Sequence, residues 1–463
     1  MEESNVQPDD KNKYDAQLTD SEDKILKKWY QKRRYNLYVY TVCKCLYGFE
    51  YSAISISALY YFQYIIRVSN PKLYYSAAIG ALFVSPVISS SWLVRYVDRS
   101  RNLRGAALCV ACFNFAGNVI YVLPFVSWLP ILGRFICGIA EGIDGTYQGE
   151  LSRTYSSKEL SYHMKSMQMY TIICHAIAPV SPILFRWVHF KLFGLEFNQY
   201  NFVGVFMAVC VLVYQAMAYF MLSNLTRDEG YQLYLKMENQ EDQNSKEAES
   251  TESKEELISL KEIFTNFDIN LILVTVVLIQ FIYTQTELIV AVVVVEKFVW
   301  TIEYFSILTI GTIVIALAIL KYVQQFNGTK DTYCFLIFCS VGNSITMTIM
   351  TLLSSYPIQQ QVMRSVLIMA ALSSNIVTGY SVLMFASIAL ALVVPPHSRC
   401  SIMGVRQVTG KIACCIGYFT ATFIYDVSYI AYPIMSVSCL VLAIVFLIRS
   451  KTFFVRYCSS ETL

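Results

Sequence analysis

Apolar stretches as long as a bilayer is thick recur along almost the whole chain. About 20 apolar residues in a helix cross the hydrocarbon core of a membrane, and twelve such stretches can be counted. Charged residues are only 15% of the chain, against roughly a quarter in soluble domains. The sequence therefore predicts an all-α membrane protein with twelve transmembrane helices, at approximately 35–66, 74–96, 105–126, 128–152, 165–190, 201–223, 268–296, 302–323, 332–354, 364–391, 402–424 and 428–449.

A long polar segment separates these stretches into two sets of six. Its central part, ENQEDQNSKEAESTESKEE, is charged and lacks aromatic residues, which predicts disorder. The following LISLKEIFTNF has the pattern of a short amphipathic helix at the membrane surface. Two bundles joined by a polar linker are typical of transporters built from repeats. The expected parts are a tail at 1–34, a six-helix bundle at 35–223, a linker at 224–267, a second six-helix bundle at 268–449 and a tail at 450–463.

The basic residues indicate the orientation of the chain. Lys and Arg gather before the first stretch, after the second and fourth, and at the C-terminal end. By the positive-inside rule both termini should be cytosolic. The segment KILKKWYQKRRY also interleaves aromatic residues with basic ones. Directly before a membrane span, such a segment is expected to contact anionic lipid headgroups rather than nucleic acid.

The fourth stretch carries most of the polar residues that lie inside the membrane, in RFICGIAEGIDGTYQGE. At about 100° per residue its glycines fall on one narrow stripe. Two G-x-x-x-G pairs on this stripe predict close contact with a neighbouring helix. The glycines concerned are Gly138, Gly142, Gly145 and Gly149.

Charged side chains line the strip beside these glycines. Arg134 and Glu141 lie on it, and Asp144 is next to them. A charge near the bilayer centre is costly, so these groups should face each other or a water-filled cavity. Arg134 and Glu141 are two turns apart, about 10 Å along the axis, which is too far for direct pairing without a bridging group. They are candidates to bind a solute or a coupling ion, and a structural ion-pair network is the alternative.

Two further carboxylates lie mid-span in helices that correspond to each other. Glu50 is in the first stretch and Glu287 is in the seventh, and these two are equivalent in a fold of six plus six helices. They are expected to line one cavity from opposite halves, where either could carry a proton or be structural. His175 precedes Pro179 and Pro182, which predict a kink in the fifth helix.

The usual signatures of catalysis are missing from the sequence. No phosphate-binding G-x-x-x-x-G-K-[ST], H-E-x-x-H or usable G-x-S-x-G pattern occurs. The pair Cys109 and Cys112 lies inside an apolar stretch with no second pair nearby, which favours packing over metal binding. The protein is therefore not expected to be an enzyme, and no cofactor or metal is implied.

The segment WLVRYVDRSRNLR resembles the loop between the second and third helices of the major facilitator superfamily. Asp98 and Arg99 match the D-R of its pattern G-x-x-x-D-R-x-G-R-R, whereas Val94 and Arg101 stand at the glycine positions. The R-x-x-x-G from Arg134 also resembles the fourth-helix motif of that superfamily. The resemblance implies that Asp98, flanked by Arg99 and Arg101, caps the start of the eleventh helix and locks one conformation. Ordinary positive-inside charge is the alternative.

A narrower resemblance points to the lysosomal branch of this superfamily that is associated with neuronal ceroid lipofuscinosis. The runs TELIVAVVVVEKFVWTIEYF, GYSVLMFASIALALVVPPHSRCSIMGVRQVTGKIA and FFVRY carry it. It implies an endolysosomal transporter of unsettled substrate, with chloride conductance proposed for the branch. Glu287 matches the branch, and Glu141 and Asp144 do not.

Three functions are compatible with these features. The first is an alternating-access transporter for a small anionic or polar solute, with a monomer as the transport unit. Arg134 would attract the anionic group, and Glu141, Glu50 or Glu287 would take a coupling proton. The second is a passive anion channel, for example for chloride, on the same fold. The third is a transport-inactive membrane scaffold.

Overall fold

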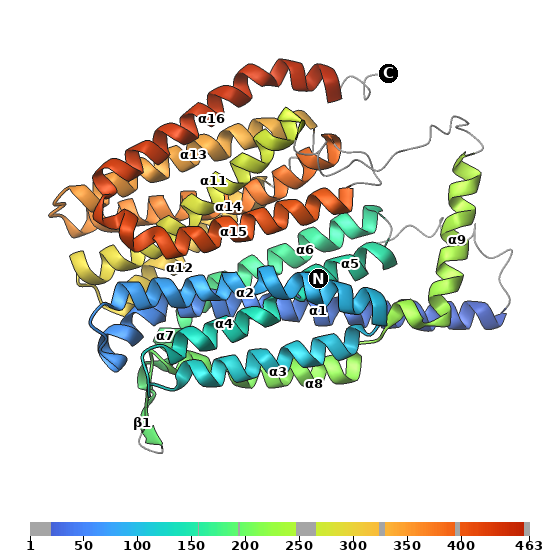
Figure 1. The fold of residues 1–463 in the computed structure, drawn as a ribbon, viewed down its shortest axis with the longest axis horizontal. Helices are drawn as coiled ribbons and strands as arrows, with labels where there is room; N and C mark the ends of the chain where they lie inside the picture. The colour runs from blue at the N-terminus through green and yellow to red at the C-terminus, as the bar shows by residue number, and fades with distance from the viewer. Residues whose placement is uncertain are drawn as a thin grey trace.

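The computed structural model describes residues 20–155, 157–192, 195–246, 265–323, 329–393 and 399–457. Almost all of them are helical, and the helices form two bundles that lie side by side (Figure 1). The first half of the chain builds one bundle and the second half builds the other. The predicted fold class, an all-α membrane protein built of two helix bundles, is confirmed.

The N-terminal half runs from Asp20 to Met221. Its α-helices are α1 (Asp20–Tyr60), α2 (Pro71–Ser100), α3 (Leu103–Val122), α4 (Leu129–Glu141), α5 (Asp144–Thr154), α6 (Ser157–Ile177), α7 (Ser181–Leu184) and α8 (Phe202–Met221). A π-helical turn at Tyr61–Ile66 continues α1. The prolines predicted to kink the fifth span do interrupt it, because 3₁₀ turns at Ala178–Val180 and Phe185–Trp187 lie on either side of α7.

The C-terminal half has an uninterrupted helix for each of its six spans. They are α11 (Phe267–Val292), α12 (Ile302–Val323), α13 (Thr329–Ser355), α14 (Gln361–Val393), α15 (Arg399–Asp426) and α16 (Ser428–Tyr457). A π-helical turn at Val293–Lys297 continues α11, as the turn at Tyr61–Ile66 continues α1. The first helix of each bundle, α1 or α11, therefore ends in a π-helical turn.

Ten helical segments of the described chain are long and apolar enough to cross a membrane. The other two predicted spans correspond to α1 and to the pair α4–α5. Helix α1 carries Lys44, Glu50 and many tyrosines, which lower its hydropathy. Helices α4 and α5 have 13 and 11 residues, each too short to span alone. When α1 and the pair α4–α5 are counted with the ten, each half of the chain has six segments at the positions of the predicted spans.

The fourth span is broken, although the sequence predicted one continuous helix. The Gly142 N–H bonds to the Ile139 carbonyl at 3.3 Å and the Ile143 N–H to the Ala140 carbonyl at 3.2 Å. This three-residue spacing is tighter than an α-helix and separates α4 from α5. A Cβ on Gly142 would lie 2.8 Å from the Ser90 amide nitrogen, so α2 approaches the backbone at this point.

The predicted glycine stripe is shorter than the sequence suggested. A Cβ on Gly138 would collide with the Leu82 carbonyl oxygen of α2, and Gly142 has the contact described above. A Cβ on Gly145 would be 3.8 Å from Val94, an ordinary contact, and one on Gly149 would meet no atom within 4 Å. Close helix packing is therefore a property of Gly138 and Gly142, and the prediction is wrong for Gly145 and Gly149.

The two halves meet along defined helix pairs. Helix α2 packs against α15, and α6 packs against α12. Helix α1 contacts both α11 and α12. The largest hydrophobic core crosses this boundary, since it contains Ile54 and Tyr61 of the first half with Ile289 and Tyr418 of the second. One further core lies within each half.

Two elements extend beyond the bundles (Figure 1). At one end an antiparallel hairpin, β1 (His189–Leu192) and β2 (Leu195–Asn198), pairs Phe190 with Phe197. At the other end α9 (Glu229–Lys246) follows the N-terminal half. These are called the hairpin end and the α9 end below. The predicted disorder is wrong where α9 reaches Lys246, and the predicted amphipathic helix at 257–264 lies outside the described residues.

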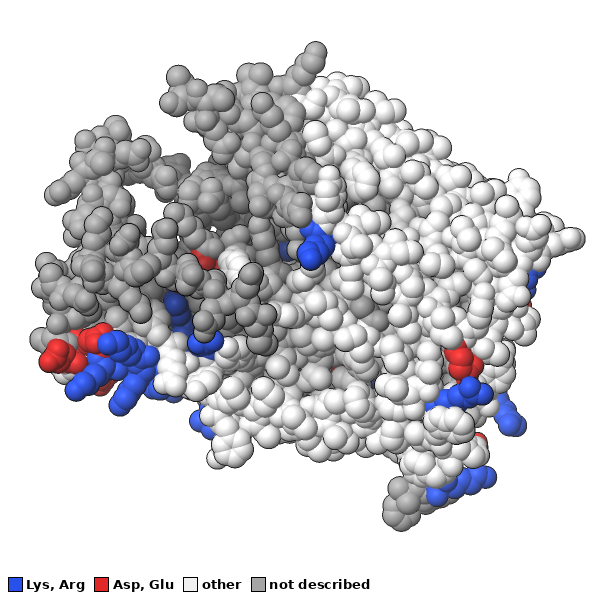
Figure 2. Space-filling model, turned by 180° about the vertical axis from the view of Figure 1, so that it is seen from behind, with Lys and Arg blue, Asp and Glu red and all other residues white. Residues whose placement is uncertain are grey.

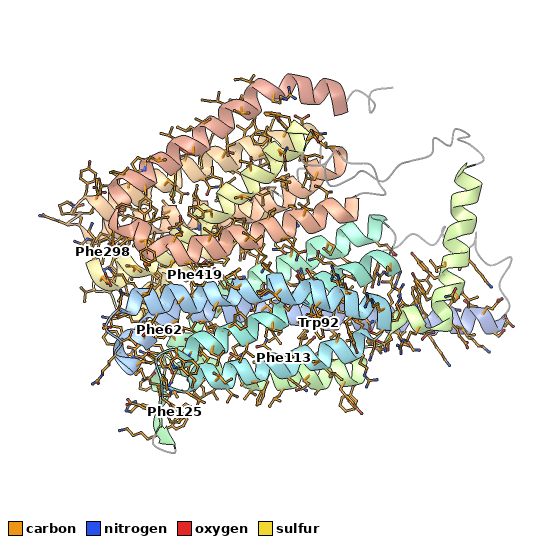
Figure 3. All side chains as sticks on the ribbon, in the orientation of Figure 1. Phe62, Trp92, Phe113, Phe125, Phe298 and Phe419 are labelled. Carbon is orange, nitrogen blue, oxygen red and sulfur yellow. The ribbon has the colours of Figure 1, made fainter. Side chains whose placement is uncertain are left out.

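The outer surface fits a lipid environment. On the face seen in Figure 2, charged side chains gather mainly toward the two ends, with a wide, nearly uncharged band between them. Large aromatic side chains point outward, including Trp92, Phe113 and Phe125 (Figure 3), which are 59%, 39% and 67% exposed. So much exposed apolar surface is rare in soluble monomers and is expected where the solvent is hydrocarbon.

Candidate functional site

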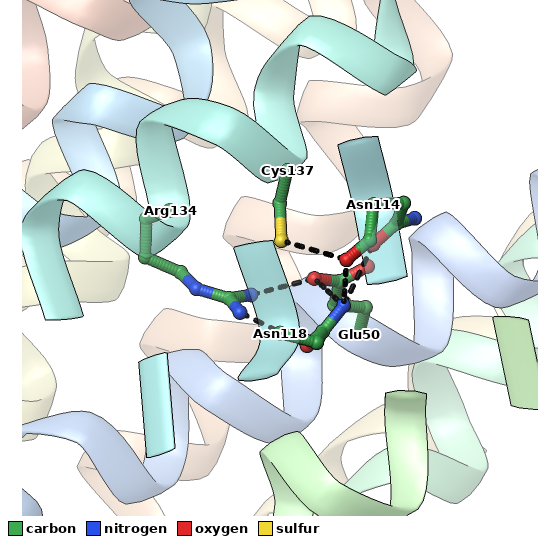
Figure 4. Close-up of polar contacts among 5 residues, drawn as sticks. All are labelled: Glu50, Asn114, Asn118, Arg134 and Cys137. Atoms are coloured by element: carbon green, nitrogen blue, oxygen red, sulfur yellow. Dashed lines mark hydrogen bonds and ion pairs between the residues drawn. The ribbon is translucent and has the colours of Figure 1, made fainter. Parts of the chain in front are cut away.

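Arg134 is the centre of a buried charge network inside the N-terminal half (Figure 4). Its Nη1 donates to Oε1 of Glu50 at 2.6 Å, and its Nη2 donates to Oδ1 of Asn118 at 2.9 Å. The guanidinium carbon lies 4.3 Å from the centre of the Tyr121 ring. The Asn118 amide also donates to Glu50, at 3.1 Å, and to Oδ1 of Asn114, at 2.6 Å. Three helices, α1, α3 and α4, are joined in this way.

This network changes the roles expected for Arg134 and Glu50. The Arg134 side chain is 0% exposed and that of Glu50 is 3% exposed, and neither lines the cavity between the halves. Arg134 and Glu141 do not pair with each other, which agrees with the prediction from their spacing. The geometry does not support Arg134 as a solute-binding residue, or Glu50 as a residue of the same cavity as Glu287. Both are buried in the structural ion-pair network that was the alternative interpretation.

Glu141 and Asp144 have different partners. Glu141 of α4 pairs with Lys411 of α15, which links the two halves. Lys411 also lies 4.9 Å from the centre of the Phe83 ring. Asp144 pairs with Lys44 of α1 at 2.9 Å within the N-terminal half. Its charge also acts on Arg406 and Lys411 of α15. The side chains of Glu141 and Lys411 are 23% and 27% exposed, so this pair is not sealed in the protein.

A cavity of about 70 Å³ lies between the halves. Helices α1, α2 and α6 line it from the N-terminal half, and α11, α12 and α14 line it from the C-terminal half. Apolar and aromatic side chains form most of the wall. The polar side chains among them include Tyr51, Ser52, His175, Glu287, Asn375 and Tyr380.

Glu287 is held in the cavity wall by two tyrosines. The Tyr418 hydroxyl of α15 donates to Oε2 of Glu287 at 2.9 Å, and the Tyr51 hydroxyl of α1 donates to the same oxygen. Tyr51 and Tyr418 also contact each other through their hydroxyls. Among the described residues Glu287 forms no ion pair, in contrast to Glu50. The predicted position of Glu287 facing the other half agrees with this geometry.

Contacts between the halves lie on both sides of the cavity. On the side toward the hairpin end, Lys72 of α2 pairs with Glu296 at 2.5 Å, and the Tyr60 hydroxyl donates to the Trp300 carbonyl at 3.0 Å. On the side toward the α9 end, Glu141 pairs with Lys411. On helix α15, Lys411 of this contact and Tyr418, which donates to Glu287, are seven residues apart, about 10 Å along the helix.

Comparison with solved structures identifies the fold. A POT family transporter in complex with 5-aminolevulinic acid matches with a TM-score of 0.65 and 12% identity, over 90% of this chain and 96% of that one. The xylose transporter XylE from E. coli, in a partially occluded inward-open conformation, matches with a TM-score of 0.62 and 12% identity, over 90% and 98%. The chain has the major facilitator fold.

The comparisons go no further than the fold. No family model matches the chain, and no curated protein does. At 12% identity the likeness to transporters carries neither a substrate nor a set of site residues. The resemblance to the lysosomal branch finds no support in these comparisons, and it stays a prediction.

The predicted gating residues lie at the end of α2. The side chain of Asp98 is outside the described part of the structure, so its proposed contact with the eleventh helix stays a prediction. Arg99 and Arg101 are exposed. Arg101 has φ 50°, in the left-handed region, and its N–H bonds to the Val97 carbonyl at 2.7 Å. An arginine therefore adopts the conformation for which the superfamily pattern has glycine.

Sequence reasoning missed several residues in and beside the cavity. It did not single out Tyr51, which lines the cavity, or Tyr418, which contacts Glu287, because tyrosine is frequent in this chain. Asn375 is a polar residue in the long apolar run at 364–391, which was an available signal. Lys411, in the eleventh apolar stretch, was also missed, although an intramembrane cation is itself evidence for a buried partner.

Proposed function

We propose that this protein is a transmembrane transporter that moves a small polar solute by alternating access. The observation that carries the proposal is a cavity lined by both halves, with contacts between the halves on either side of it. Because both halves belong to one chain, a monomer is a sufficient transport unit. An endolysosomal membrane is the location implied by the sequence resemblance, and it stays a prediction.

The two sides are held by ion pairs of different kinds. The side chains of Lys72 and Glu296 are 26% and 36% exposed, and a solvent-exposed ion pair contributes roughly 1 kcal/mol or less, so the hairpin side can open at little cost. Glu141 and Lys411 lie within the membrane-spanning bundle, where separated charges need water or another partner. The α9 side is therefore expected to open only when water enters. The buried Arg134–Glu50 pair holds α1 and α4 together, so that the N-terminal half moves as a unit.

Glu287 is the carboxylate best placed to take up a coupling proton. Glu50 and Glu141 each have a cationic partner, whereas Glu287 has two neutral tyrosines. An ionised carboxylate without a cation is costly once water is excluded. When the cavity is closed to water, Glu287 is therefore held best if it has bound a proton or a positively charged ligand.

An anion channel is less well supported by the same geometry. Among the described residues that line the cavity there is no lysine or arginine, and the charged side chain is a carboxylate. Such a lining offers no cation to attract chloride or other anions. The channel nevertheless makes a distinct prediction, because a channel needs no alternation between its two sides.

Chemical cross-linking tests the alternation. In a background without native cysteines, Lys72→Cys with Glu296→Cys places a thiol pair on the hairpin side, and Glu141→Cys with Lys411→Cys places one on the α9 side. Each pair is bridged by a short bifunctional thiol reagent. Uptake into proteoliposomes is measured for labelled small cations, neutral polyols and anions. Bridging either pair should abolish uptake, because both halves must separate on each side in turn.

The matched control joins two residues of one half. Lys44 and Asp144 form an ion pair 2.9 Å apart within the N-terminal half, and Lys44→Cys with Asp144→Cys should tolerate bridging without loss of uptake. If both cross-half bridges leave solute flux unchanged, alternating access is excluded. A current that follows an imposed anion gradient in the bridged protein would establish a channel instead.

A further inference from the structure

We propose that the solute is a small organic cation whose charged end is a protonated amine, and that this amine and a proton occupy Glu287 in turn. The proposal rests on the proposed transport function and names the chemistry of its cavity. It replaces the anionic solute expected from the sequence, because Arg134 is now accounted for by Glu50.

The charge of the cavity wall favours a cation. Glu287 is the acidic side chain among the described lining residues, and no lysine or arginine lies beside it there. Its Oε2 accepts hydrogen bonds from Tyr51 and Tyr418, and these two contacts fix the carboxylate in the wall. A bound cation would provide the opposite charge that Glu287 lacks.

Aromatic rings surround this carboxylate. Tyr283 and Tyr380 meet nearly edge to face, with ring centres 6.3 Å apart. The His175 ring lies 5.5 Å from Tyr51 and 6.0 Å from Tyr380. The faces of aromatic rings attract cations, and protein sites for ammonium ligands are commonly built from several such rings. The aromatic wall and the carboxylate therefore both favour a cationic ligand.

Asn375 supplies an acceptor that has no partner among the described residues. Its side-chain nitrogen donates to the Tyr283 carbonyl at 3.0 Å. A carbonyl can only accept, so the amide nitrogen must face it and Oδ1 must point the other way. Asn375 is 1% exposed and lines the cavity, and its Oδ1 is buried without a hydrogen bond. An unmade hydrogen bond of this kind is costly, and an ammonium N–H in the cavity would satisfy it.

The size of the cavity limits the ligand. About 70 Å³ is room for roughly five water-sized probes. In this conformation the cavity therefore accepts a compact amine of a few non-hydrogen atoms, and a larger cation would need the halves to separate.

Binding of the amine and of the proton must exclude each other. Among the described residues, the other titratable groups near Glu287 are tyrosines, one cysteine and one histidine; they are Tyr51, Tyr75, Tyr283, Tyr380, Tyr418, Cys414 and His175. None of them is a second carboxylate. When the cation arrives, the proton on the Glu287 carboxyl leaves to solvent, and the carboxylate pairs with the ammonium. The carrier then exchanges one cation for one proton.

Equilibrium binding to the protein in lipid nanodiscs tests this assignment. The probe is labelled tetramethylammonium, a compact cation with a fixed charge. Propylamine, propan-1-ol and propanoate compete for the same site, and they differ mainly in charge. We expect propylamine to displace the probe while the alcohol and the carboxylate do not. Probe binding should release about one proton per cation, and its affinity should fall by up to about tenfold for each pH unit on acidification.

Three variants test which side chains are responsible for cation binding and proton release. Glu287→Gln should weaken probe binding by at least about tenfold and abolish proton release. Glu303→Gln is the matched control, because Glu303 accepts from Gln199 at 3.3 Å, lies outside the cavity lining and keeps an acceptor oxygen as glutamine. Asn375→Ala should weaken propylamine by about tenfold and leave tetramethylammonium unchanged, since the latter has no N–H to donate.

Three results would overturn the proposal. The first is a probe affinity that Glu287→Gln and Glu303→Gln change equally, and the second is displacement of the probe by propanoate. The third is transport of neutral polyols while no cation binds, in which case this inference fails and the proposed transport function stands. If cations bind as described but both cross-half bridges leave flux unchanged, the site is correct and alternating access is wrong.

Discussion

At the scale of single residues, the most informative feature is that Arg134 pairs with Glu50 inside its own bundle. A buried ion pair adds little net stability compared with well-packed apolar residues, because both charges lose their hydration. Removal of one partner is different, since it leaves the other charge buried and alone. Loss of one partner of the Arg134–Glu50 pair is therefore expected mainly to destabilise the packing of α1 against α4.

This property separates a structural role of Arg134 from a role in solute binding. Arg134→Met should destabilise the protein by about 3–5 kcal/mol, because Glu50 is then left without its cation. Arg134→Met combined with Glu50→Gln should recover most of that stability and retain solute uptake. Thermal unfolding in detergent and uptake into proteoliposomes measure the two effects. A double variant that is stable but shows no uptake would mean that Arg134 has a role in solute binding.

Periodicity in the sequence could place these residues on a helix face but could not say what the face meets. Arg134 and Glu141 share a strip of the fourth span, yet Arg134 points to α1 and α3 while Glu141 points to α15. Their partners, Glu50 and Lys411, are far away in the sequence. A single sequence contains no information on which strips of two distant helices are opposed, so the pairing had to come from the structure.

At the scale of elements, α1 extends beyond its bundle and holds the first part of the linker. Trp29 of α1 is buried, donates to the Leu225 carbonyl at 3.3 Å and stacks on Tyr234 of α9 at 5.1 Å. Lys32 of α1 pairs with Asp228 at 2.5 Å, just before α9. The basic aromatic segment predicted to contact lipid headgroups is therefore also a docking surface for α9.

Gly230 is the position at which this docking is most sensitive. A Cβ at Gly230 would collide with Cβ of Trp29, and it would lie 2.7 Å from Cγ. Gly230→Ala should therefore separate α9 from α1, at a cost of about 1–3 kcal/mol for the overpacked contact. Amide hydrogen exchange should speed up in α9 and in the first turns of α1.

The control for this change is a glycine of the same protein with open space around it. A Cβ on Gly149 would meet no atom within 4 Å, so Gly149→Ala should leave exchange in α1 and α9 unchanged. Equal exchange rates in α9 for wild type and Gly230→Ala would show that the Trp29 contact does not hold this helix.

The sequence predicted elements well where hydrophobic length decides them. Ten spans follow directly from long apolar runs, and Pro179 and Pro182 interrupt the fifth span as expected. Elements that depend on neighbours were not predicted. The break after Glu141 arises where α2 crowds Gly142, and α9 is docked on Trp29, a residue about 200 positions earlier in the chain. Local sequence contains neither contact.

At the scale of the whole molecule, the balance between the two sides of the cavity decides which way the protein opens. The pair of Lys72 and Glu296 belongs to the hairpin side. Lys72→Glu should replace attraction by repulsion there and shift the population toward opening on that side. Thiol labelling of a cysteine introduced at Ser55, in the cavity wall, should become several-fold faster from the hairpin side.

The reciprocal change tests whether charge is the cause. Lys72→Glu combined with Glu296→Lys restores an opposite pair in the same place and should return labelling to the wild-type rate. A double variant that stays as open as Lys72→Glu would mean that other contacts, such as the hydrogen bond from Tyr60 to Trp300, control this side.

The presence of Glu287 as the acidic group of the cavity wall also has an electrical consequence. Moving one net charge against 100 mV requires about 2.3 kcal/mol. A carrier that returns with a proton for each cation delivered moves no net charge in a full turn. Membrane voltage then does no work on the cycle, and only the difference in acidity between two compartments can drive accumulation. Such a carrier would work equally well in a depolarised organelle, provided that its lumen is acidic.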